Sequence, residues 1–78
     1  MKNPSAVKAF GVHLRRLRES RDLSQQELAD MADLAKITIQ RIENAKFTVT
    51  LDVLVSISEA LTIPLKVMLD FQFENING

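Results

Sequence analysis

The chain has 78 residues with ten Lys/Arg and ten Asp/Glu, and 46% of its residues are hydrophobic. It has no cysteine, which excludes a disulfide framework and a thiolate metal site. No uninterrupted apolar run is long enough to span a bilayer, and the first residues lack the apolar stretch of a signal peptide. We therefore expect one small domain over residues 1–78, located in the cytoplasm, with no metal, cofactor or membrane association.

The charges are unevenly distributed although they sum to zero. Residues 1–46 contain nine Lys/Arg and six Asp/Glu, whereas residues 47–78 contain one and four. The first part can therefore present a basic face to a polyanion. The excess of positive charge in residues 1–46 is small, so its electrostatic field is expected to be weak. Any non-specific affinity for DNA should therefore be modest and sensitive to salt.

The first predicted helix begins at Asn3 or Ser5, with Pro4 in its first turn, where proline is tolerated. Gly11 lies inside this helix and weakens the prediction, because glycine is a poor helix former. Four apolar residues at helical spacing mark its buried stripe: Val7, Phe10, Leu14 and Leu17.

Ser24 and Glu27 have the spacing of a capping box, which predicts that a second helix begins there. A tight turn at residues 33–34 follows, and then a third helix with Ile39 and Ile42 facing inward. Thr50 is suited to cap a fourth helix.

The C-terminal third is unusually apolar, since fourteen of the 23 residues in 51–73 are hydrophobic. The predicted fourth helix carries two apolar strips, one of which includes Val53 and Ile57. One small core does not need both strips, so we expect a second chain to cover part of this surface.

The segment after Pro64 fits two conformations. Apolar and polar residues alternate along it, which favours a strand, but a fifth helix that buries Leu65, Met68 and Leu69 also fits. We favour the strand and expect residues 64–74 to dimerise, although Phe71 and Phe73 could instead belong to the core. The residues expected at the dimer interface are Val53, Ile57, Leu65, Val67, Leu69, Phe71 and Phe73.

Residues 23–46 read LSQQELADMADLAKITIQRIENAK, and this string resembles the helix-turn-helix of the Cro/lambda-repressor-like family. The flanking pieces LRRLRE and TLDVLVSISEAL fit the same family. The resemblance implies an all-α fold, a compact DNA-binding domain of four to five helices, to which a short C-terminal dimerising strand could be added. It places the helix-turn-helix at about residues 24–44.

The resemblance also implies a set of DNA contacts. The family positions that match Lys36, Ile37 and Arg41 commonly face the bases, and Gln40 lies on the same exposed face. The position that matches Gln25 binds a backbone phosphate. The side chains suit these roles, since arginine can pair with guanine and glutamine with adenine. Past the end of the helix, Asn44 and Lys46 are candidates for further phosphate contacts.

Three positions depart from the family pattern. Asp33 and Ala45 stand where glycine is usual, and Ala35 stands where a serine or threonine cap is usual. Aspartate tolerates left-handed backbone geometry, or Asp33 could itself cap a recognition helix that begins early. A further pair, Arg18 and Glu43, matches family positions that form a structural ion pair.

The sequence therefore predicts a transcriptional regulator, such as a repressor, that binds double-stranded DNA as a homodimer on an inverted-repeat operator. Two roles fit, the controller of a restriction–modification system and an antitoxin of the Hip or Hig type that also binds its toxin. The strand-like C-terminal segment favours the antitoxin. The alternative class is an adaptor whose main ligand is a partner protein. We expect no enzymatic activity, because neither a nucleophile–base arrangement nor a phosphate-cradling glycine loop is present in the sequence.

Overall fold

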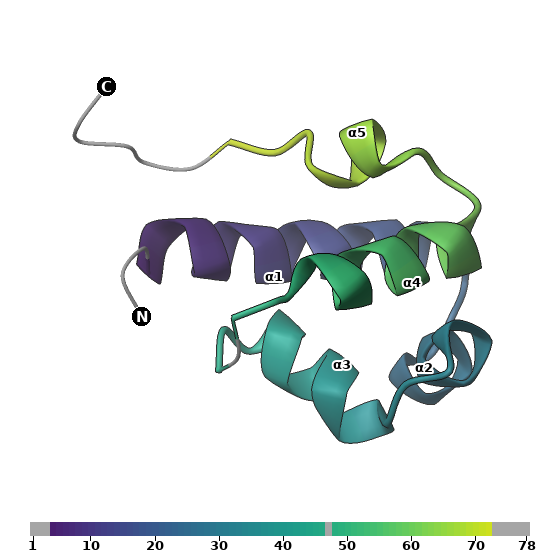
Figure 1. Ribbon diagram of the computed structural model, residues 1–78. Coiled ribbons are helices and arrows are strands. Elements are labelled where there is room, and N and C mark those ends of the chain that lie inside the picture. The colour runs from purple at the N-terminus through teal and green to yellow at the C-terminus, as the bar shows by residue number, and fades with distance from the viewer. Residues whose placement is uncertain (1–3, 47, 73–78) are drawn as a thin grey trace.

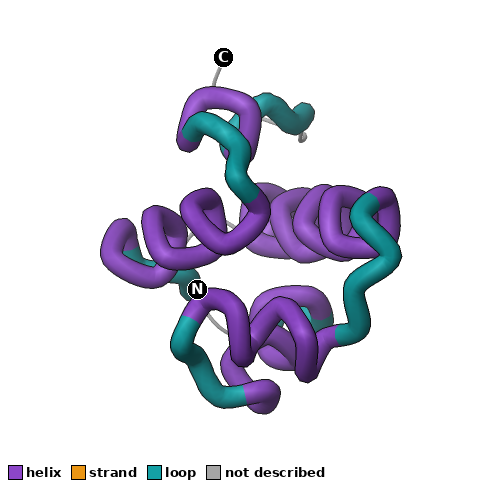
Figure 2. The backbone as a smooth tube through the Cα atoms, turned by 90° about the vertical axis from the view of Figure 1, so that its right-hand side faces the viewer, coloured by secondary structure: helices purple, strands orange, loops and turns teal. Residues whose placement is uncertain are grey.

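The computed structural model describes residues 4–46 and 48–72, and within these ranges every regular element is a helix (Figures 1 and 2). The helices are α1 (Pro4–Ser20), α2 (Gln25–Ala32), α3 (Lys36–Glu43), α4 (Leu51–Leu61) and α5 (Leu65–Met68). This agrees with the expected all-α fold of four to five helices. None of the described helices combines the length and the apolar character needed to cross a membrane.

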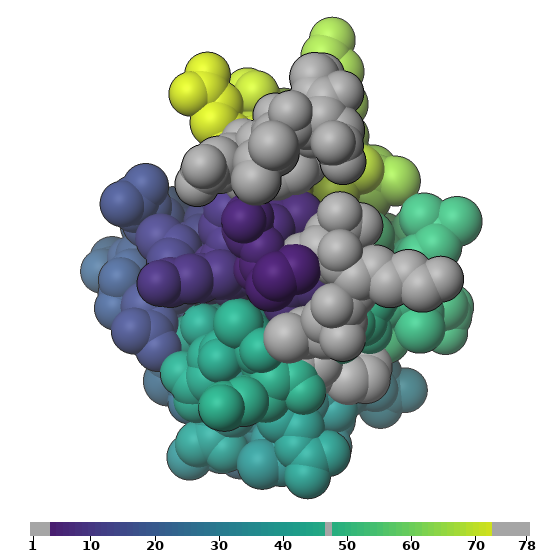
Figure 3. All heavy atoms as spheres, turned by 90° about the vertical axis from the view of Figure 1, so that its left-hand side faces the viewer, coloured from purple at the N-terminus to yellow at the C-terminus, as the bar shows by residue number. Residues whose placement is uncertain are grey.

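The helices form three levels, which Figure 1 shows from top to bottom. α1 and α4 occupy the middle, α2 and α3 lie below them, and α5 lies above them together with the segment that follows it. Seen from the end at which α1 begins, the start of α1 lies between α3 and this C-terminal segment (Figure 3). The arrangement leaves one side of α3 free of the other described helices.

Every helix contributes to one hydrophobic core. The buried apolar residues recur at spacings of three and four, so that each helix turns one stripe inward. These residues are Phe10, Leu14, Leu28, Ala29, Ala32, Ile39, Ile42, Ile57, Leu61 and Met68.

The predicted helix starts are present. The Ser24 hydroxyl accepts the backbone N–H of Glu27 at 3.0 Å, and the Glu27 carboxylate accepts the backbone N–H of Ser24 at 2.8 Å. Thr50 caps α4 by accepting the N–H of Val53 at 3.3 Å. Of the two predicted starts of α1, Asn3 lies outside the described residues.

The turn before α3 settles the role of Asp33. This residue ends α2 with a left-handed backbone at φ 56°, and the next N–H, that of Leu34, donates to the Ala29 carbonyl at 2.8 Å. Ala35 occupies the N-cap of α3 and makes no capping bond with its side chain. The alternative in which Asp33 caps an early-starting helix is therefore wrong, because α3 begins at Lys36.

The predicted strand is wrong over Leu65–Met68, which form α5. Met68 is fully buried and Leu65 packs against the core. A strand would turn these two residues to opposite faces, whereas a helical spacing of three turns both toward the core. Leu69, expected inside in the helical alternative, is 44% exposed, and Phe73 lies outside the described residues.

The set of dimerisation residues needs a correction as well. Ile57 is fully buried within the core of the single chain, so it is not available to a partner. Val53 is half-buried and packs against the same core. The ring of Phe71 lies 5.6 Å from the ring of Phe10, which makes it a contact within the chain. The second apolar strip of α4 thus faces inward, because α5 and the segment after it extend the core.

Candidate nucleic-acid interface

α3 has two distinct faces. Ile39 and Ile42 are fully buried against the core, whereas Lys36, Ile37 and Arg41 are exposed. Ile37 has 48% of its surface exposed. The exposed face therefore carries two cations and one apolar side chain.

Other predicted DNA contacts lie close to this face in the chain. Gln40 is half-buried on α3. Asn44 is the exposed C-cap of α3, and Lys46 follows two residues later, also exposed. The backbone turns sharply there, since the N–H of Lys46 donates to the Arg41 carbonyl at 2.7 Å. The turn is made by Ala45 at φ 57°, where the family usually has glycine.

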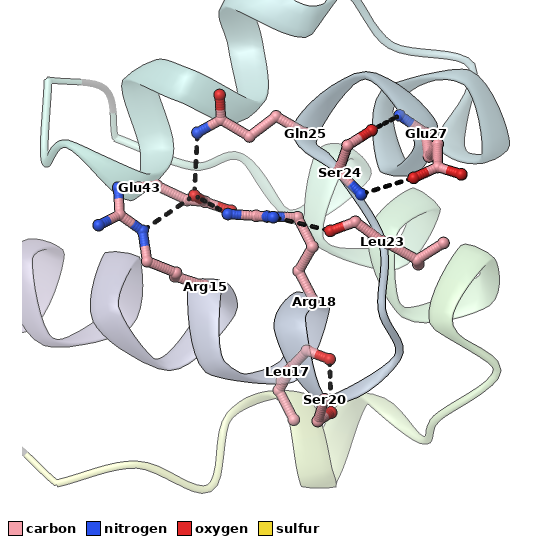
Figure 4. Close-up of polar contacts among 9 residues, drawn as sticks. All are labelled: Arg15, Leu17, Arg18, Ser20, Leu23, Ser24, Gln25, Glu27 and Glu43. Atoms are coloured by element: carbon pink, nitrogen blue, oxygen red, sulfur yellow. Dashed lines mark hydrogen bonds and ion pairs between the residues drawn. The ribbon is translucent and has the colours of Figure 1, made fainter.

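Glu43, at the end of α3, is the centre of a polar cluster that joins three helices (Figure 4). The Arg18 guanidinium donates to both carboxylate oxygens, Nε to Oε2 at 2.7 Å and Nη2 to Oε1 at 3.0 Å. The remaining Arg18 nitrogen, Nη1, donates to the Leu23 carbonyl at 2.7 Å. The expected ion pair between Arg18 and Glu43 is therefore present, and it fixes α1 against the end of α3.

Two further side chains donate to the same carboxylate. Gln25, the first residue of α2, donates its Nε2 to Oε1 of Glu43 at 3.0 Å. Arg15 on α1 donates its Nε to that oxygen at 3.3 Å. The structure thus brings Gln25 to Glu43 at the C-terminal end of α3.

The contacts shift the acid–base equilibria of the pair. Burial alone would raise the pKa of Glu43, but hydrogen bonds from Arg18, Gln25 and Arg15 and the charge of Arg18 outweigh it, so this pKa is lowered. The hydrogen bond to Glu43 raises the pKa of Arg18. Both groups are consequently charged at neutral pH, and the cluster of one carboxylate and two guanidiniums carries a net positive charge.

Arg15 is absent from the residues that the sequence predicted to pair with Glu43 or to contact DNA. A signal was available, because Arg15 precedes Arg18 by three residues and the two therefore share one side of α1. The contact between Gln25 and Glu43 had no such signal, since residues 18 apart in sequence meet only through the packing of α2 on α3.

Comparisons with known proteins agree with this geometry. The family model HTH_3, described as helix-turn-helix, matches residues 14–67. The restriction–modification controller protein C.AhdI from Aeromonas hydrophila is similar, with 32% identity, a TM-score of 0.76, and coverage of 81% of this chain and 94% of that one.

Two further solved structures are similar. One is an HTH_3 family transcriptional regulator from Vibrio cholerae, with 25% identity, a TM-score of 0.74, and coverage of 83% of this chain and 35% of that one. The clp gene regulator ClgR from Corynebacterium glutamicum shares the fold at 23% identity and a TM-score of 0.76, with coverage of 82% and 83%. No curated protein sequence matches the chain.

Proposed function

Because the chain belongs to the helix-turn-helix family HTH_3, we propose that it is a transcriptional regulator that binds double-stranded DNA with α3 in the major groove. One observation carries this proposal. α3 is anchored by Ile39 and Ile42 in the core, while Lys36, Ile37 and Arg41 face solvent. A helix held in this way can enter a groove without losing any packing.

The proposed base contacts follow from the chemistry of the exposed side chains. Arg41 pairs with the two acceptors of a guanine edge, and Lys36 reaches guanine acceptors or a phosphate. Ile37 packs on a thymine methyl group, and Gln40 pairs with adenine. Gln25, Asn44 and Lys46 contact phosphates, which sets the register on DNA but does not read sequence.

We propose further that the protein acts as a homodimer on an inverted repeat, because one recognition helix reads only a few base pairs. The exposed apolar side chains of α4 and of the segment from residue 65 onward support a dimer surface there. Among the described residues these side chains are Leu51, Val55, Val67 and Leu69. Val67 and Leu69 belong to the set predicted from the sequence, whereas Leu51 and Val55 are added because the structure exposes them. Sedimentation at tens of micromolar tests the dimer, and the doubly substituted V67K/L69K variant should sediment as a monomer. A parent protein that sediments as a monomer would contradict it.

Of the two candidate roles, we propose the controller of a restriction–modification system. The similarity to C.AhdI over most of both chains supports it. The antitoxin role was favoured by a strand-like C-terminal segment, whereas Leu65–Met68 are helical. A methyltransferase reading frame beside the gene would support the controller, and a toxin reading frame would contradict it.

The test of DNA binding is selection from a random duplex library, followed by titration on the recovered sequence and on a scrambled one at two salt concentrations. We expect a specific complex whose affinity falls as salt rises, since bound phosphates release counterions. Recovery of no preferred sequence, or equal weak binding to the recovered and the scrambled duplexes, would contradict the proposal and favour an adaptor that binds a partner protein.

A further inference from the structure

We propose that Arg15 and Gln25 form a phosphate clamp, two donors that Glu43 holds ready for one backbone phosphate of duplex DNA. The inference rests on the proposed function and extends it to a residue on α1, outside the helix-turn-helix. It assigns a binding role to Arg15 and a positioning role to Glu43.

Gln25 and Arg15 are positioned by hydrogen bonds to the same carboxylate oxygen of Glu43. Oε1 of Glu43 accepts Nε2 of Gln25 at 3.0 Å and Nε of Arg15 at 3.3 Å, so both donors lie within hydrogen-bond distance of one atom, which they approach from different directions (Figure 4). The Glu43 side chain has no exposed surface, whereas the Arg15 side chain is 48% exposed. The carboxylate is therefore covered, and Gln25, Arg15 and the buried Arg18 are the side chains that donate to it.

Arg15 and Arg18 differ in what they have left to donate. Arg18 directs Nε and both terminal nitrogens to Glu43 and the Leu23 carbonyl. Arg15 uses only Nε, and neither of its terminal nitrogens has a hydrogen bond to a described residue. Gln25 uses one hydrogen of Nε2 and keeps the second. The spare donors are the ones that a phosphate oxygen needs.

The charges of the cluster also fit one phosphodiester. Arg18 and Glu43 neutralise each other in a buried pair. Arg15 is left as a positive charge, and one backbone phosphate supplies one negative charge. The bond from Nε to Glu43 already restricts the Arg15 side chain, so less conformational freedom is lost when the guanidinium meets the phosphate.

Arg15→Ala is the test, and Arg16→Ala is its matched control. Arg16 is adjacent, exposed and of equal charge, but it lines a hollow on another side of α1 together with Lys8, His13 and Phe71. Affinities are measured on the selected duplex and on its scrambled form. We expect Arg15→Ala to weaken binding to both about tenfold, as for a hydrogen bond to a charged group. The plot of log affinity against log salt should become less steep, by the amount expected for the loss of about one phosphate contact.

A charge-conserving variant and a double-mutant cycle distinguish the clamp from a simple effect of charge. Arg15→Lys keeps the charge, but all its donors are on one nitrogen, so it cannot place one nitrogen on Glu43 and another on the phosphate as the guanidinium does, and it should also bind less tightly. The double variant R15A/Q25A should lose less DNA affinity than the product of the two single-variant fold-losses, because both donors bind one phosphate.

The outcomes distinguish the clamp from the proposed function on which it rests. If the parent protein binds DNA but Arg15→Ala and Arg16→Ala have equal affinity and equal salt slopes, the clamp is overturned and the proposed function stands. If the parent protein binds no duplex, the proposed function fails and the clamp fails with it. Circular dichroism of each variant shows whether the fold is retained before binding is compared.

Discussion

Gly11 in α1 lies directly against the backbone of Ile42 in α3. A methyl group on Gly11 would be 2.5 Å from the Ile42 carbonyl oxygen and 2.9 Å from that of Glu43. This close approach of the two helices brings the side chains of Arg15 and Arg18 within reach of the Glu43 carboxylate. The glycine that weakens the helix by sequence criteria is thus required by the helix packing that builds the site.

Gly11→Ala is therefore expected to destabilise the protein, although alanine is the better helix former by about 1 kcal/mol. The added methyl group meets backbone atoms, which cannot rotate away, so α1 and α3 must separate at a net cost of about 1–3 kcal/mol. Urea unfolding measures the change. Val12→Ala, at the neighbouring exposed position, is the control and should change stability little. An increase in stability for Gly11→Ala would show that the helices are not in close contact.

Glu43→Ala should destabilise the fold by about 3 kcal/mol, because it leaves the buried Arg18 guanidinium without its counter-ion. Glu59→Ala removes an exposed carboxylate that has no ion pair with any described residue, and should cost little. Both free energies come from urea unfolding at neutral pH. A loss below about 0.5 kcal/mol for Glu43→Ala would be typical of an exposed pair and would rule out a structural role.

The same carboxylate should make stability depend on pH. The pKa of Glu43 in the folded protein is lowered from its ordinary value of 4.5, so ionisation stabilises the fold. That stabilisation is complete above the unfolded-state pKa and is lost as the pH falls through the folded-state pKa. We expect the melting temperature of the parent to fall on acidification below about pH 4.5 more steeply than that of Glu43→Gln. Parallel pH profiles for the two proteins would argue against a lowered pKa.

Ala45→Gly should stabilise the protein by about 1 kcal/mol, since Ala45 has a left-handed backbone at φ 57° that glycine adopts without strain. The control is the same substitution inside a helix. Ala9→Gly in α1 should destabilise by about 1 kcal/mol because it adds backbone freedom to the unfolded chain and lowers helix propensity. Thermal unfolding of the two variants should therefore shift in opposite directions, and a shift in the same direction would contradict the assignment of strain to Ala45.

Local signals predicted most of the fold. The capping box at Ser24 and Glu27, the cap at Thr50 and the apolar periodicity of residues 24–44 depend only on neighbours in sequence, and each is present. The failures depend on long-range packing. Alternation along residues 65–73 favoured a strand, but the burial of Met68 against the core selected a helix. The inward position of Ile57 likewise follows from what packs on α4, which its own periodicity does not reveal.

In the candidate site, too, some features were predicted from the sequence and others depend on long-range packing. The resemblance to the family implied that Lys36, Ile37 and Arg41 face outward, and the structure exposes them while it buries Ile39 and Ile42. The cluster at Glu43 was predicted only in part. Its Arg18 contact was expected, but the two other donors come from α1 and α2, and their convergence depends on how closely these helices approach α3.

The prediction that bears most directly on function concerns Arg41, an exposed side chain that contributes nothing to the buried core. Arg41→Ala should weaken binding to the selected duplex by about 1–3 kcal/mol and relax the preference at one base pair, because an arginine that pairs with guanine reads sequence. Gln25→Ala is the contrast, and it should weaken selected and scrambled duplexes about equally, because a phosphate contact carries no sequence information. Titrations of both variants on both duplexes, at two salt concentrations, measure the difference. If Arg41→Ala binds the selected duplex as tightly as the parent does, then Arg41 does not read a base, and the turn formed by Asp33 and Ala35 has placed α3 in the groove with a different set of contacts.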